Sequence, residues 1–404
     1  MTMFEDDGDL KLDWAAARMP VLASVSAEIA AAGGVAGKRI GICLTLEPKT
    51  ANLALALARA GADVAVHCPP SGTSDDVAAA LARRGVDVYA SATASPAEND
   101  ALADAFLSSG LEVLIDDGAT MIRRLHSHHA ELLGTLLGAA EETTSGVRPL
   151  RAMAEDGELR IPVLAVNDAR SKYLFDNLYG TGQSCVMTFL DLTNLQLAGR
   201  TCLVVGYGWV GRGVARHAAA MGARIVVSEI DPIKALQAAY DGHEVAPISV
   251  AGRDADVVFT ATGLRDTITP EHLAFLRDGV FLAVAGGEEE EIPMARLRAS
   301  GSRTPVRPGV DEYLVDGRTV SVIADGECMN VSAAEGNPIE VMDLSLSLQA
   351  IAAARISTGA IPTAAGVHRM DDDAEEEVAR LRLAADGGAL EPLTETIRQA
   401  MRAW

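Results

Sequence analysis

Residues 199–232 read GRTCLVVGYGWVGRGVARHAAAMGARIVVSEIDP, and this stretch decides the fold class of the chain. Thr201–Val205 is a short apolar run that predicts a strand, and it leads directly into Gly206-Tyr207-Gly208-Trp209-Val210-Gly211. In a G-x-G-x-x-G turn the first glycine permits the tight bend, the second lets a pyrophosphate approach the backbone, and the third lets the helix lie close to the strand. The stretch therefore predicts a dinucleotide site at a helix N-terminus.

The residues after the turn complete the unit that such a site requires. Val210–Met221 has apolar residues at helical spacing and is followed by Gly222, and Ile225–Val227 predicts a second strand that leads to Glu229. A carboxylate at this place is the expected partner of a ribose diol. Because the flanking strands and the acid are present together, we interpret the turn as a nucleotide site rather than an ordinary βα turn.

The composition limits the classes of partner. The chain has 404 residues, of which 49% are hydrophobic, so two or three domains with an extensive core are expected. Its formal net charge of −22 at pH 7 argues against nucleic acid or an anionic membrane as a partner, because most of the surface would repel either. We find neither a signal-peptide pattern at the start nor an apolar run long enough for a membrane span, so we expect a cytoplasmic protein.

Neither the cysteines nor the histidines predict a metal site. The five cysteines lack C-x-x-C spacing, and several lie in apolar strand-like runs, which is typical of reduced thiols. His126, His128 and His129 lie close together in a predicted helix, but only an i, i+3 pair could share a face and no third ligand is evident. We therefore interpret these histidines as part of a solvated helix surface and expect no metal.

Strands and helices alternate on both sides of the opening unit. Asp116-Asp117-Gly118 follows one predicted strand and Asn167-Asp168 follows another, at the strand ends where parallel sheets place their ligands. The pattern predicts an α/β chain with two doubly wound sheets. The remaining strands are expected at residues 39–44, 64–67, 86–89, 113–115, 161–166, 257–260, 280–284 and 320–324.

Several segments are expected to be simple connections. Glu141–Gly146 and Glu288–Glu291 are interpreted as polar, solvated loops. Gly180–Leu197 is interpreted as one long helix that leads into the opening unit, and residues 339–356 as an apolar helix that leads out of it.

Longer motifs resemble those of the S-adenosylhomocysteine hydrolase (adenosylhomocysteinase) family, and the similarity extends from near residue 18 to near residue 380. The motifs are VLIDDGAT (113–120), AEETTSGV (140–147), PVLAVNDARSKYLFDNLYG (162–180), GYGWVGRG (206–213) and SEIDPIKALQAAYDGHEV (228–245). The resemblance implies two doubly wound, Rossmann-like domains, with the NAD-binding domain (residues 181–341) inserted in a substrate-binding domain (1–180 and 342–390), and a tail (391–404). It also implies tightly bound NAD, a small-molecule nucleoside substrate, and a homotetramer or homodimer.

The resemblance further implies a redox cofactor that is restored in every turnover. In that chemistry the 3′-hydroxyl of a nucleoside is oxidised to a ketone, the acidified C4′ proton is removed, the C5′ substituent is eliminated, water adds, and the ketone is reduced. Matched by position, Lys172 would be the base on the 3′-hydroxyl, which requires its pKa to be lowered, and Asp117 would carry protons near C4′ and C5′. Asp176 and Glu142 would hold the ribose hydroxyls, and Asn177 would lie beside the nicotinamide.

Other residues match the family's cofactor contacts, although Trp209 stands where the family usually has a small or an acidic residue. Glu229 favours NAD over NADP. The predicted cofactor set is Thr143, Thr144, Ser145, Gly206, Gly208, Trp209, Val210, Gly211, Glu229, Thr262, Gly263 and Asn330.

The chain departs from the family at three active-site histidines. The family's H-x-T-x-E-T signature, which serves the leaving group and the adenine edge, is matched by residues 45–50, TLEPKT; its N-I-G-H-F is matched by 284–288, VAGGE; and its G-H-P is matched by 336–338, GNP. In the first segment a shift of two residues would instead leave Thr45 and Glu47 as an adenine clamp, and both registers stay open. Thr181 stands in place of a cysteine and Lys234 in place of an asparagine, and we expect the family's basic, tyrosine-containing tail to be absent after Trp404.

These departures divide the predicted site. Lys172, Asp176, Asn177 and Glu142, which would serve the oxidation, are retained, whereas the histidines that would serve the C5′ substituent and the base are lost. We therefore expect the oxidation and the removal of the C4′ proton to survive. Loss of water from an exocyclic CH2OH, followed by reduction without re-addition, would give a 4′,5′-unsaturated nucleoside, a reaction suited to nucleoside antibiotic biosynthesis. The expected substrate contacts are Thr45, Glu47, Lys49, Glu142 and Asn337.

Three alternatives stay open. One is ordinary hydrolysis of S-adenosylhomocysteine to adenosine and homocysteine, with waters or Asp117 in place of the histidines. Another is a catalytically silent, NAD-binding regulatory protein, and a third is a plain dehydrogenase that releases NADH. The retained Lys172, with Asp176 four residues later, argues against a silent protein.

Overall fold

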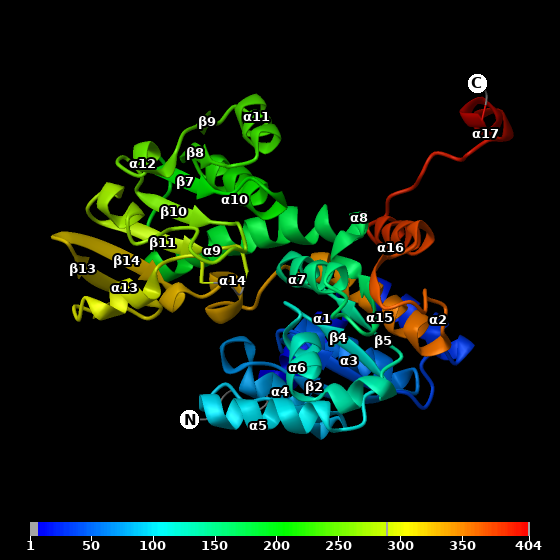
Figure 1. Ribbon diagram of the computed structural model, residues 1–404. Coiled ribbons are helices and arrows are strands. Elements are labelled where there is room, and N and C mark those ends of the chain that lie inside the picture. Colours follow the sequence, from blue (N-terminus) through cyan, green and yellow to red (C-terminus); the bar gives the residue numbers. More distant parts are fainter. Residues whose placement is uncertain (1–6, 288–289, 403–404) are drawn as a thin grey trace.

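The computed structural model describes residues 7–287 and 290–402, which form two β-sheets with helices packed around each (Figure 1). The first sheet has seven strands in the order β15-β6-β5-β4-β1-β2-β3, and all neighbouring strands are parallel. The strands are β1 (Arg39–Cys43), β2 (Asp63–His67), β3 (Asp87–Tyr89), β4 (Val113–Asp116), β5 (Gly138–Glu141), β6 (Pro162–Ala165) and β15 (Gly366–Arg369).

The helices of this first lobe come from both ends of the chain. The longest, α15 (Ile339–Thr358), packs against α2 and α3 and crosses the sheet near β4 and β5. The others are α1 (Asp7–Ala16), α2 (Pro20–Ala32), α3 (Pro48–Arg59), α4 (Asp75–Arg83), α5 (Pro96–Leu107), α6 (Thr120–His128), α7 (Thr144–Glu155), α8 (Arg170–Tyr173) and α16 (Asp372–Ala385), with 3-10 turns η1 (Pro70–Gly72), η2 (Ala130–Thr135) and η3 (Val166–Asp168).

The second sheet has eight strands in the order β12-β13-β14-β11-β10-β7-β8-β9, in which β13 runs antiparallel to both of its neighbours, β12 and β14. Its strands are β7 (Thr201–Val205), β8 (Arg224–Ser228), β9 (Glu244–Val245), β10 (Val257–Thr260), β11 (Val280–Val284), β12 (Thr304–Arg307), β13 (Val310–Val315) and β14 (Arg318–Ile323). Its helices are α9 (Gly182–Thr193), α10 (Trp209–Ala220), α11 (Pro232–Tyr240), α12 (Ile248–Ala251), α13 (Met294–Ala299) and α14 (Met329–Ser332), with turns η5 (His272–Phe275) and η6 (Ala324–Gly326).

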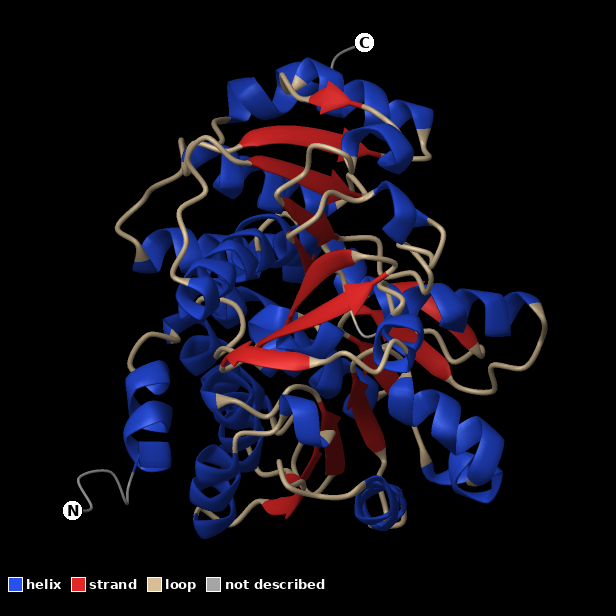
Figure 2. Cartoon of the chain, turned by 90° about the vertical axis from the view of Figure 1, so that its left-hand side faces the viewer, coloured by secondary structure: helices blue, strands red, loops and turns tan. Residues whose placement is uncertain are grey.

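The order of the strands confirms the predicted fold class. β15 joins the first sheet after the chain has formed the second, so the second lobe is inserted in the first. Figure 2 shows the strands of both sheets lying between helices, and Figure 1 shows α17 (Glu395–Arg402) apart from both lobes. α17 has no buried residue.

Each sheet has a switch point, where the chain begins to add strands on the opposite side. In the first sheet it lies between β1 and β4, and in the second between β7 and β10. Loops at a switch point diverge and leave a crevice at the carboxyl ends of the strands. Thr45 and Asp117 follow the first pair of strands, and Gly206 and Thr262 follow the second, so the topology places all four at crevices.

The glycine turn has the geometry that its sequence predicts. Gly206 has a φ of 93°, which a residue with a side chain rarely adopts. A Cβ on Gly211 would lie 1.9 Å from the carbonyl oxygen of Gly206, so only glycine lets α10 approach the strand this closely. The N-terminus of α10 therefore faces the crevice with its first backbone N–H groups, which a helix cannot pair internally.

Three sequence interpretations are wrong. Glu141 ends strand β5, and α7 begins at Thr144, so the segment 141–146 is not a single loop, because Glu141 is buried against backbone N–H groups. The predicted helix 180–197 is shorter, since a π-helical turn (Asp176–Thr181) precedes α9. Glu291 is 0% exposed and not solvated, whereas Glu288 of the same predicted loop lies outside the described residues. The antiparallel strands β12 and β13 were not predicted.

Within the described ranges no single helix is long and apolar enough to cross a membrane; α1 and α2, which are bent by 81°, pass that test only as a pair, by length and composition. Among the same residues no three His, Cys, Asp or Glu side chains are grouped so that they could hold a metal ion. Nε2 of His129 lies 2.7 Å from the carboxylate of Asp104, and His126 is half-buried, so the three histidines do not form a uniformly solvated face.

Candidate active site

A cavity of about 840 Å³ lies where the two switch points face each other. Most of the predicted site residues line it, so residues far apart in the sequence are brought together. Gly211 does not line it, because it packs beneath the turn. The predicted residues that do are Thr45, Glu47, Lys49, Asp117, Glu142, Thr143, Thr144, Ser145, Lys172, Asp176, Asn177, Gly206, Gly208, Trp209, Val210, Glu229, Thr262, Gly263, Asn330 and Asn337.

Lys172 lies at the centre of a buried polar cluster. Its Nζ is 2.9 Å from Oδ2 of Asp176 and 3.7 Å from Oε1 of Glu142, and it donates to Oδ1 of Asn177 at 3.2 Å. The side chains of Lys172, Asp176 and Glu142 are all at least nine-tenths buried. The short helix α8 and the π-helical turn after it present Lys172, Asp176 and Asn177 to the same cavity.

The charges around Lys172 oppose the pKa that the sequence led us to expect. Burial by itself lowers the pKa of Lys172, but the carboxylates of Asp176 and Glu142 outweigh burial and raise it above its ordinary value. In turn, burial raises the pKa of Glu142, although the lysine charge lowers it. Lys172 is therefore an ammonium at neutral pH in this arrangement, and a positive group bound nearby would be needed to lower its pKa.

Two polar residues of α15 support this cluster and were missed in the sequence. Ser345 Oγ donates to Glu142 and lies 3.4 Å from Oδ2 of Asp176, and Gln349 Nε2 donates to the other oxygen of Glu142. Both side chains are fully buried in a helix that was interpreted as simply apolar. Their spacing of four residues places them on one face of the helix, and that spacing was the available signal.

Two further buried carboxyl groups shape the loops at the ends of β4 and β5. Glu141 accepts from the backbone N–H groups of Gly118 and Ala119 and from that of Thr143. Asp116 accepts from three backbone N–H groups of the following turn, and burial raises its pKa to about 7. These side chains fix the loops that carry Asp117, Glu142 and Thr143, so they organise the site without lining the cavity.

In the second lobe, Glu291 is likewise a buried carboxylate that accepts from the backbone N–H groups of a loop. Its carboxylate accepts from the backbone N–H groups of Thr262 and Gly263 at 3.0 and 2.9 Å, and from the hydroxyl of Thr262. Burial raises the pKa of Glu291. The carboxylate thus holds the loop after β10 against the glycine turn, which explains why Glu291 is buried.

The residues around the glycine turn fit NAD. Nothing lies within 4 Å of a Cβ placed on Gly208, so this glycine opens onto free space as a pyrophosphate cradle requires. Glu229 is fixed by the backbone N–H groups of Tyr207 and Ile230, both at 2.7 Å, and lines the cavity. The hydroxyl of Ser145 is buried with no partner among the described residues and faces the same space, so a ligand group could satisfy it.

Trp209 joins the two lobes at the mouth of the cavity. Its ring stacks on Tyr173, which follows Lys172, with ring centroids 5.0 Å apart and planes at 26°. The guanidinium of Arg212, one turn further along α10, lies 5.2 Å from the centroid of the same tryptophan ring. The unusual residue in the glycine turn therefore contributes an aromatic contact between the cofactor turn and the helix that carries Lys172.

The part of the cavity near Asp117 is built differently. A second, smaller cavity of about 60 Å³ adjoins it, with Thr45, Asp117 and Cys328 in the walls of both. A space of this size holds only a few waters. Of the residues that the structure describes around these two cavities, none is a histidine, so no imidazole from elsewhere replaces those that the sequence lacks.

Glu47 and Lys49 are engaged with each other at this end. Glu47 caps α3 by accepting from the backbone N–H groups of Lys49 and Thr50 at 2.9 and 3.0 Å. Lys49 Nζ lies 2.6 Å from the Glu47 carboxylate and donates to the carbonyl of Glu335. Helix capping therefore accounts for the geometry of Glu47, and its role toward an adenine stays a prediction.

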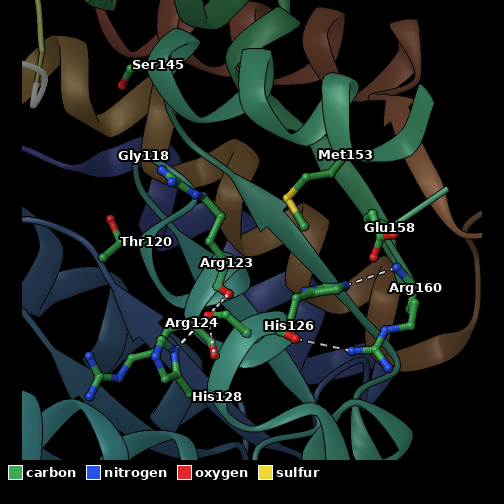
Figure 3. Close-up of a pocket in the computed structure, with 11 residues that line it drawn as sticks. Gly118, Thr120, Arg123, Arg124, His126, His128, Ser145, Met153, Glu158 and Arg160 are labelled. Atoms are coloured by element: carbon green, nitrogen blue, oxygen red, sulfur yellow. Dashed lines mark hydrogen bonds between the residues drawn. The ribbon is translucent and has the colours of Figure 1, made fainter. Parts of the chain in front are cut away.

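Figure 3 shows a separate cavity of about 700 Å³ that is lined by residues of α6, α7 and the segment after α7. It contains His126, which accepts from the backbone N–H of Arg160, and Arg124, whose guanidinium pairs with Asp100 and Asp104. Ser145 borders both this cavity and the central one. None of the predicted catalytic residues lines it.

Comparison with known proteins identifies the family. The family model described as S-adenosyl-L-homocysteine hydrolase, NAD binding domain, matches residues 177–336, and that described as S-adenosyl-L-homocysteine hydrolase matches residues 3–132. The S-inosyl-L-homocysteine hydrolase of Methanopyrus kandleri is 43% identical over 97% of this chain and 94% of that protein. The chain belongs to the S-adenosyl-L-homocysteine hydrolase family. The family prediction and the NAD prediction are thereby confirmed.

Relatives within the family carry different names. The adenosylhomocysteinase of Thermotoga maritima is 40% identical over 98% of this chain and 99% of that protein. Among solved structures, the pyruvate reductase of Chlamydomonas reinhardtii has a TM-score of 0.37 and 17% identity, and the match covers 66% of this chain and 74% of that chain. That structural likeness carries no argument about function. The family supports an NAD-dependent, adenosylhomocysteinase-like enzyme.

Proposed function

We propose that the protein is a nucleoside dehydratase that works through transient oxidation of a sugar hydroxyl. The observation that supports this most is the contrast between an intact Lys172 cluster and a small cavity beside Asp117 that has no imidazole group among its described lining residues. The cluster suits proton transfer at a sugar hydroxyl. A cavity of about 60 Å³ suits a leaving group of the size of water better than a homocysteine.

Bound NAD would be held by Glu229, the glycine turn and the loop that carries Ser145, and it supplies a reversible two-electron oxidant. Its oxidised nicotinamide is positively charged, so it favours the neutral form of a lysine nearby. Lys172 would then take the proton of the 3′-type hydroxyl, with Asp176 and Glu142 holding the hydroxyls in place. Asn177 would orient Lys172 from the cofactor side.

The elimination needs one base and one acid near C4′ and C5′, and Asp117 is the carboxyl group that lines both the central and the small cavity. The C4′ proton is acidic beside the ketone; its removal forms the C4′–C5′ double bond as the C5′–O bond breaks, and the oxygen leaves as water after receiving a proton. The ketone is then reduced with the two electrons first taken from the sugar. The net change is loss of one water, without net oxidation.

A second candidate is hydrolysis of a nucleosyl thioether such as S-adenosylhomocysteine. The names of two relatives favour it, since the M. kandleri protein is an S-inosyl-L-homocysteine hydrolase and the T. maritima protein is an adenosylhomocysteinase. In that case water would add after elimination, and Asp117 with ordered water would replace the family's histidines. The thioether tail would have to find room outside the small cavity.

One experiment separates the candidates. The purified protein is incubated with adenosine, the psicose analogue of adenosine, S-adenosylhomocysteine and S-inosylhomocysteine, and the products are identified by mass spectrometry. Loss of one water's mass from a nucleoside is the expected result. Release of homocysteine would establish hydrolysis instead, and failure of every compound to exchange its C4′ proton with deuterated solvent would contradict both dehydration and hydrolysis.

A further inference from the structure

Asn337 stands where the family has the third histidine, and its amide is completely used by the protein. Its Nδ2 donates to Oδ1 of Asp176 and, at 3.0 Å, to Oγ1 of Thr181. Its Oδ1 accepts from Oγ of Ser184 at 2.8 Å and from Nδ2 of Asn330 at 3.0 Å. An asparagine amide has two donor hydrogens and two acceptor lone pairs, so no hydrogen-bonding position is left for a substrate.

The partners of Asn337 fix which way its amide faces. Asp176 accepts from Asn337 through a carboxylate oxygen, and the amide of Asn330 presents its Nδ2 to Asn337. A flipped amide would place an oxygen against a carboxylate and two NH2 groups against each other. All hydrogen bonds of the network are therefore satisfied in one arrangement only. In it Asn337 binds Oδ1 of Asp176, while Oδ2 of the same carboxylate faces Lys172.

The network also connects the two places where the chain passes between the lobes. Asp176, Thr181 and Ser184 lie where the chain leaves the first sheet, and Asn330 and Asn337 lie before α15, where it returns. A Cβ on Gly180 would be 3.0 Å from Cγ and Nδ2 of Asn337, so the amide packs closely against the backbone that carries Asp176. Asn337 is thus held by packing as well as by hydrogen bonds.

We propose that Asn337 is a positioning residue that holds the Asp176 carboxylate against Lys172, and that Thr181 is its necessary partner. The proposal rests on the proposed function, because it takes Lys172 and Asp176 as the group that acts on the sugar hydroxyl. Asn337 was predicted to contact the substrate; in this proposal it instead positions Asp176 beside Lys172. A histidine could not replace it, because an imidazole has only two nitrogens and cannot donate twice and accept twice. A cysteine at 181 would be a weaker acceptor than Thr181.

The catalytic test measures single-turnover oxidation of adenosine, followed by the near-ultraviolet absorbance of bound reduced cofactor, over a range of pH. We expect Asn337→Ala to slow oxidation by about 10–100-fold and to change the pH profile, because Asp176 loses its fixed position. Gly180→Ala, which displaces the amide without removing it, should act in the same direction with a smaller effect. Asn337→Gln should recover more activity than Asn337→Ala.

Asn52→Ala is the matched control. Asn52 is a buried asparagine whose Nδ2 donates to the carbonyls of Leu12 and Pro48, away from the cavity. It should lower the thermal unfolding midpoint without changing the pH profile. If Asn337→Ala leaves the pH profile as it is in the parent protein, the proposal is overturned.

A second measurement does not depend on the reaction. Thermal unfolding midpoints are compared for Asn337→Ala, Thr181→Val and the double variant, all with NAD bound. We expect the double variant to lose less than the sum of the two single losses, because the two side chains share one hydrogen bond. Additive losses would overturn the pairing. If adenosine and its analogues are never oxidised by the parent protein, the proposed function fails, while this cycle still reports on Asn337 and Thr181.

Discussion

The two ends of the central cavity differ in the side chains that the protein brings together there. At the first, which we call the Lys172 end, the side chains of Lys172, Asp176 and Glu142 are buried and bonded to one another. At the second, the Asp117 end, Thr45 and Asp117 border a small cavity without a histidine among its described residues. The group that we propose for the oxidation is thus preorganised, whereas the end that we propose for the leaving group is a small space with the carboxyl groups of Asp117 and Glu327 in its wall.

Of the variants that test this comparison, Lys172→Ala should have the largest effect on the rate of oxidation. Removing a general base lowers a rate by about 10²–10⁴-fold, so bound cofactor should no longer be reduced when a nucleoside is added. The near-ultraviolet absorbance of reduced nicotinamide measures this directly. Lys172→Arg is the informative companion, since it retains the positive charge but cannot lose its proton at accessible pH.

Lys172→Ala needs a control for correct folding. Without the ammonium, Asp176 and Glu142 are left as buried carboxyl groups without a cation, which is strongly destabilising. NAD content and thermal unfolding are therefore measured on the same samples. A folded, NAD-loaded Lys172→Arg variant that still reduces its cofactor would contradict the assignment of Lys172 as the base.

Asp117→Asn tests the other end and should have a narrower effect. An amide can hydrogen-bond but cannot carry a proton, so elimination should slow by about 10²-fold or more while oxidation continues. Reduced cofactor should then accumulate during incubation with a nucleoside, while little product with the mass of a dehydrated nucleoside forms. Equal loss of both steps would mean that the two ends do not act separately.

The sequence predicted the glycine turn and the polar ends of the strands well because their signals are local. The glycine turn with Glu229, and the acids Asp116 and Asp117 at the end of β4, each occupy a few residues close together in the sequence, beside strands whose periodicity is clear. The roles expected of Lys172 and Asp176 came from the resemblance of one motif, residues 162–180, to the family. All of these residues except Gly211 and Asp116 line one cavity, as parallel sheets require at a switch point.

The supporting residues could not be predicted in the same way, because their partners are distant in the chain. Ser345 and Gln349 are buried in an apolar helix only because they donate to Glu142, which is 203 and 207 positions earlier. Glu291 lies in an acidic run that by composition belongs in water, yet the loop after β10 requires its carboxylate. For Asn337, the residue type indicated a lost histidine and gave no sign of four satisfied hydrogen bonds.

Glu142→Gln gives the smallest and most specific test, because it alters a charge at the Lys172 end without removing the base. The carboxylates of Asp176 and Glu142 raise the pKa of Lys172, so the lysine must lose a proton that they help to retain. Replacing Glu142 by a neutral amide should therefore lower the pKa of Lys172. The neutral fraction of a base grows about tenfold for each unit by which its pKa falls below its former value, as long as the pH remains below the pKa.

The rate of oxidation should accordingly rise with pH in the parent protein, and the rising limb should lie at lower pH in Glu142→Gln. Single-turnover oxidation is measured at a series of pH values and at saturating adenosine. Weaker binding would change only the adenosine concentration that is needed for saturation, so it is separated from a shift of the pH profile. Ser345→Ala is the control, since it removes a hydrogen bond to Glu142 and keeps the charge. If the rising part of the pH profile is at the same pH in Glu142→Gln, or at a higher pH, the charge of Glu142 does not control the pKa of Lys172. The close contacts at the Lys172 end would then have only a structural role.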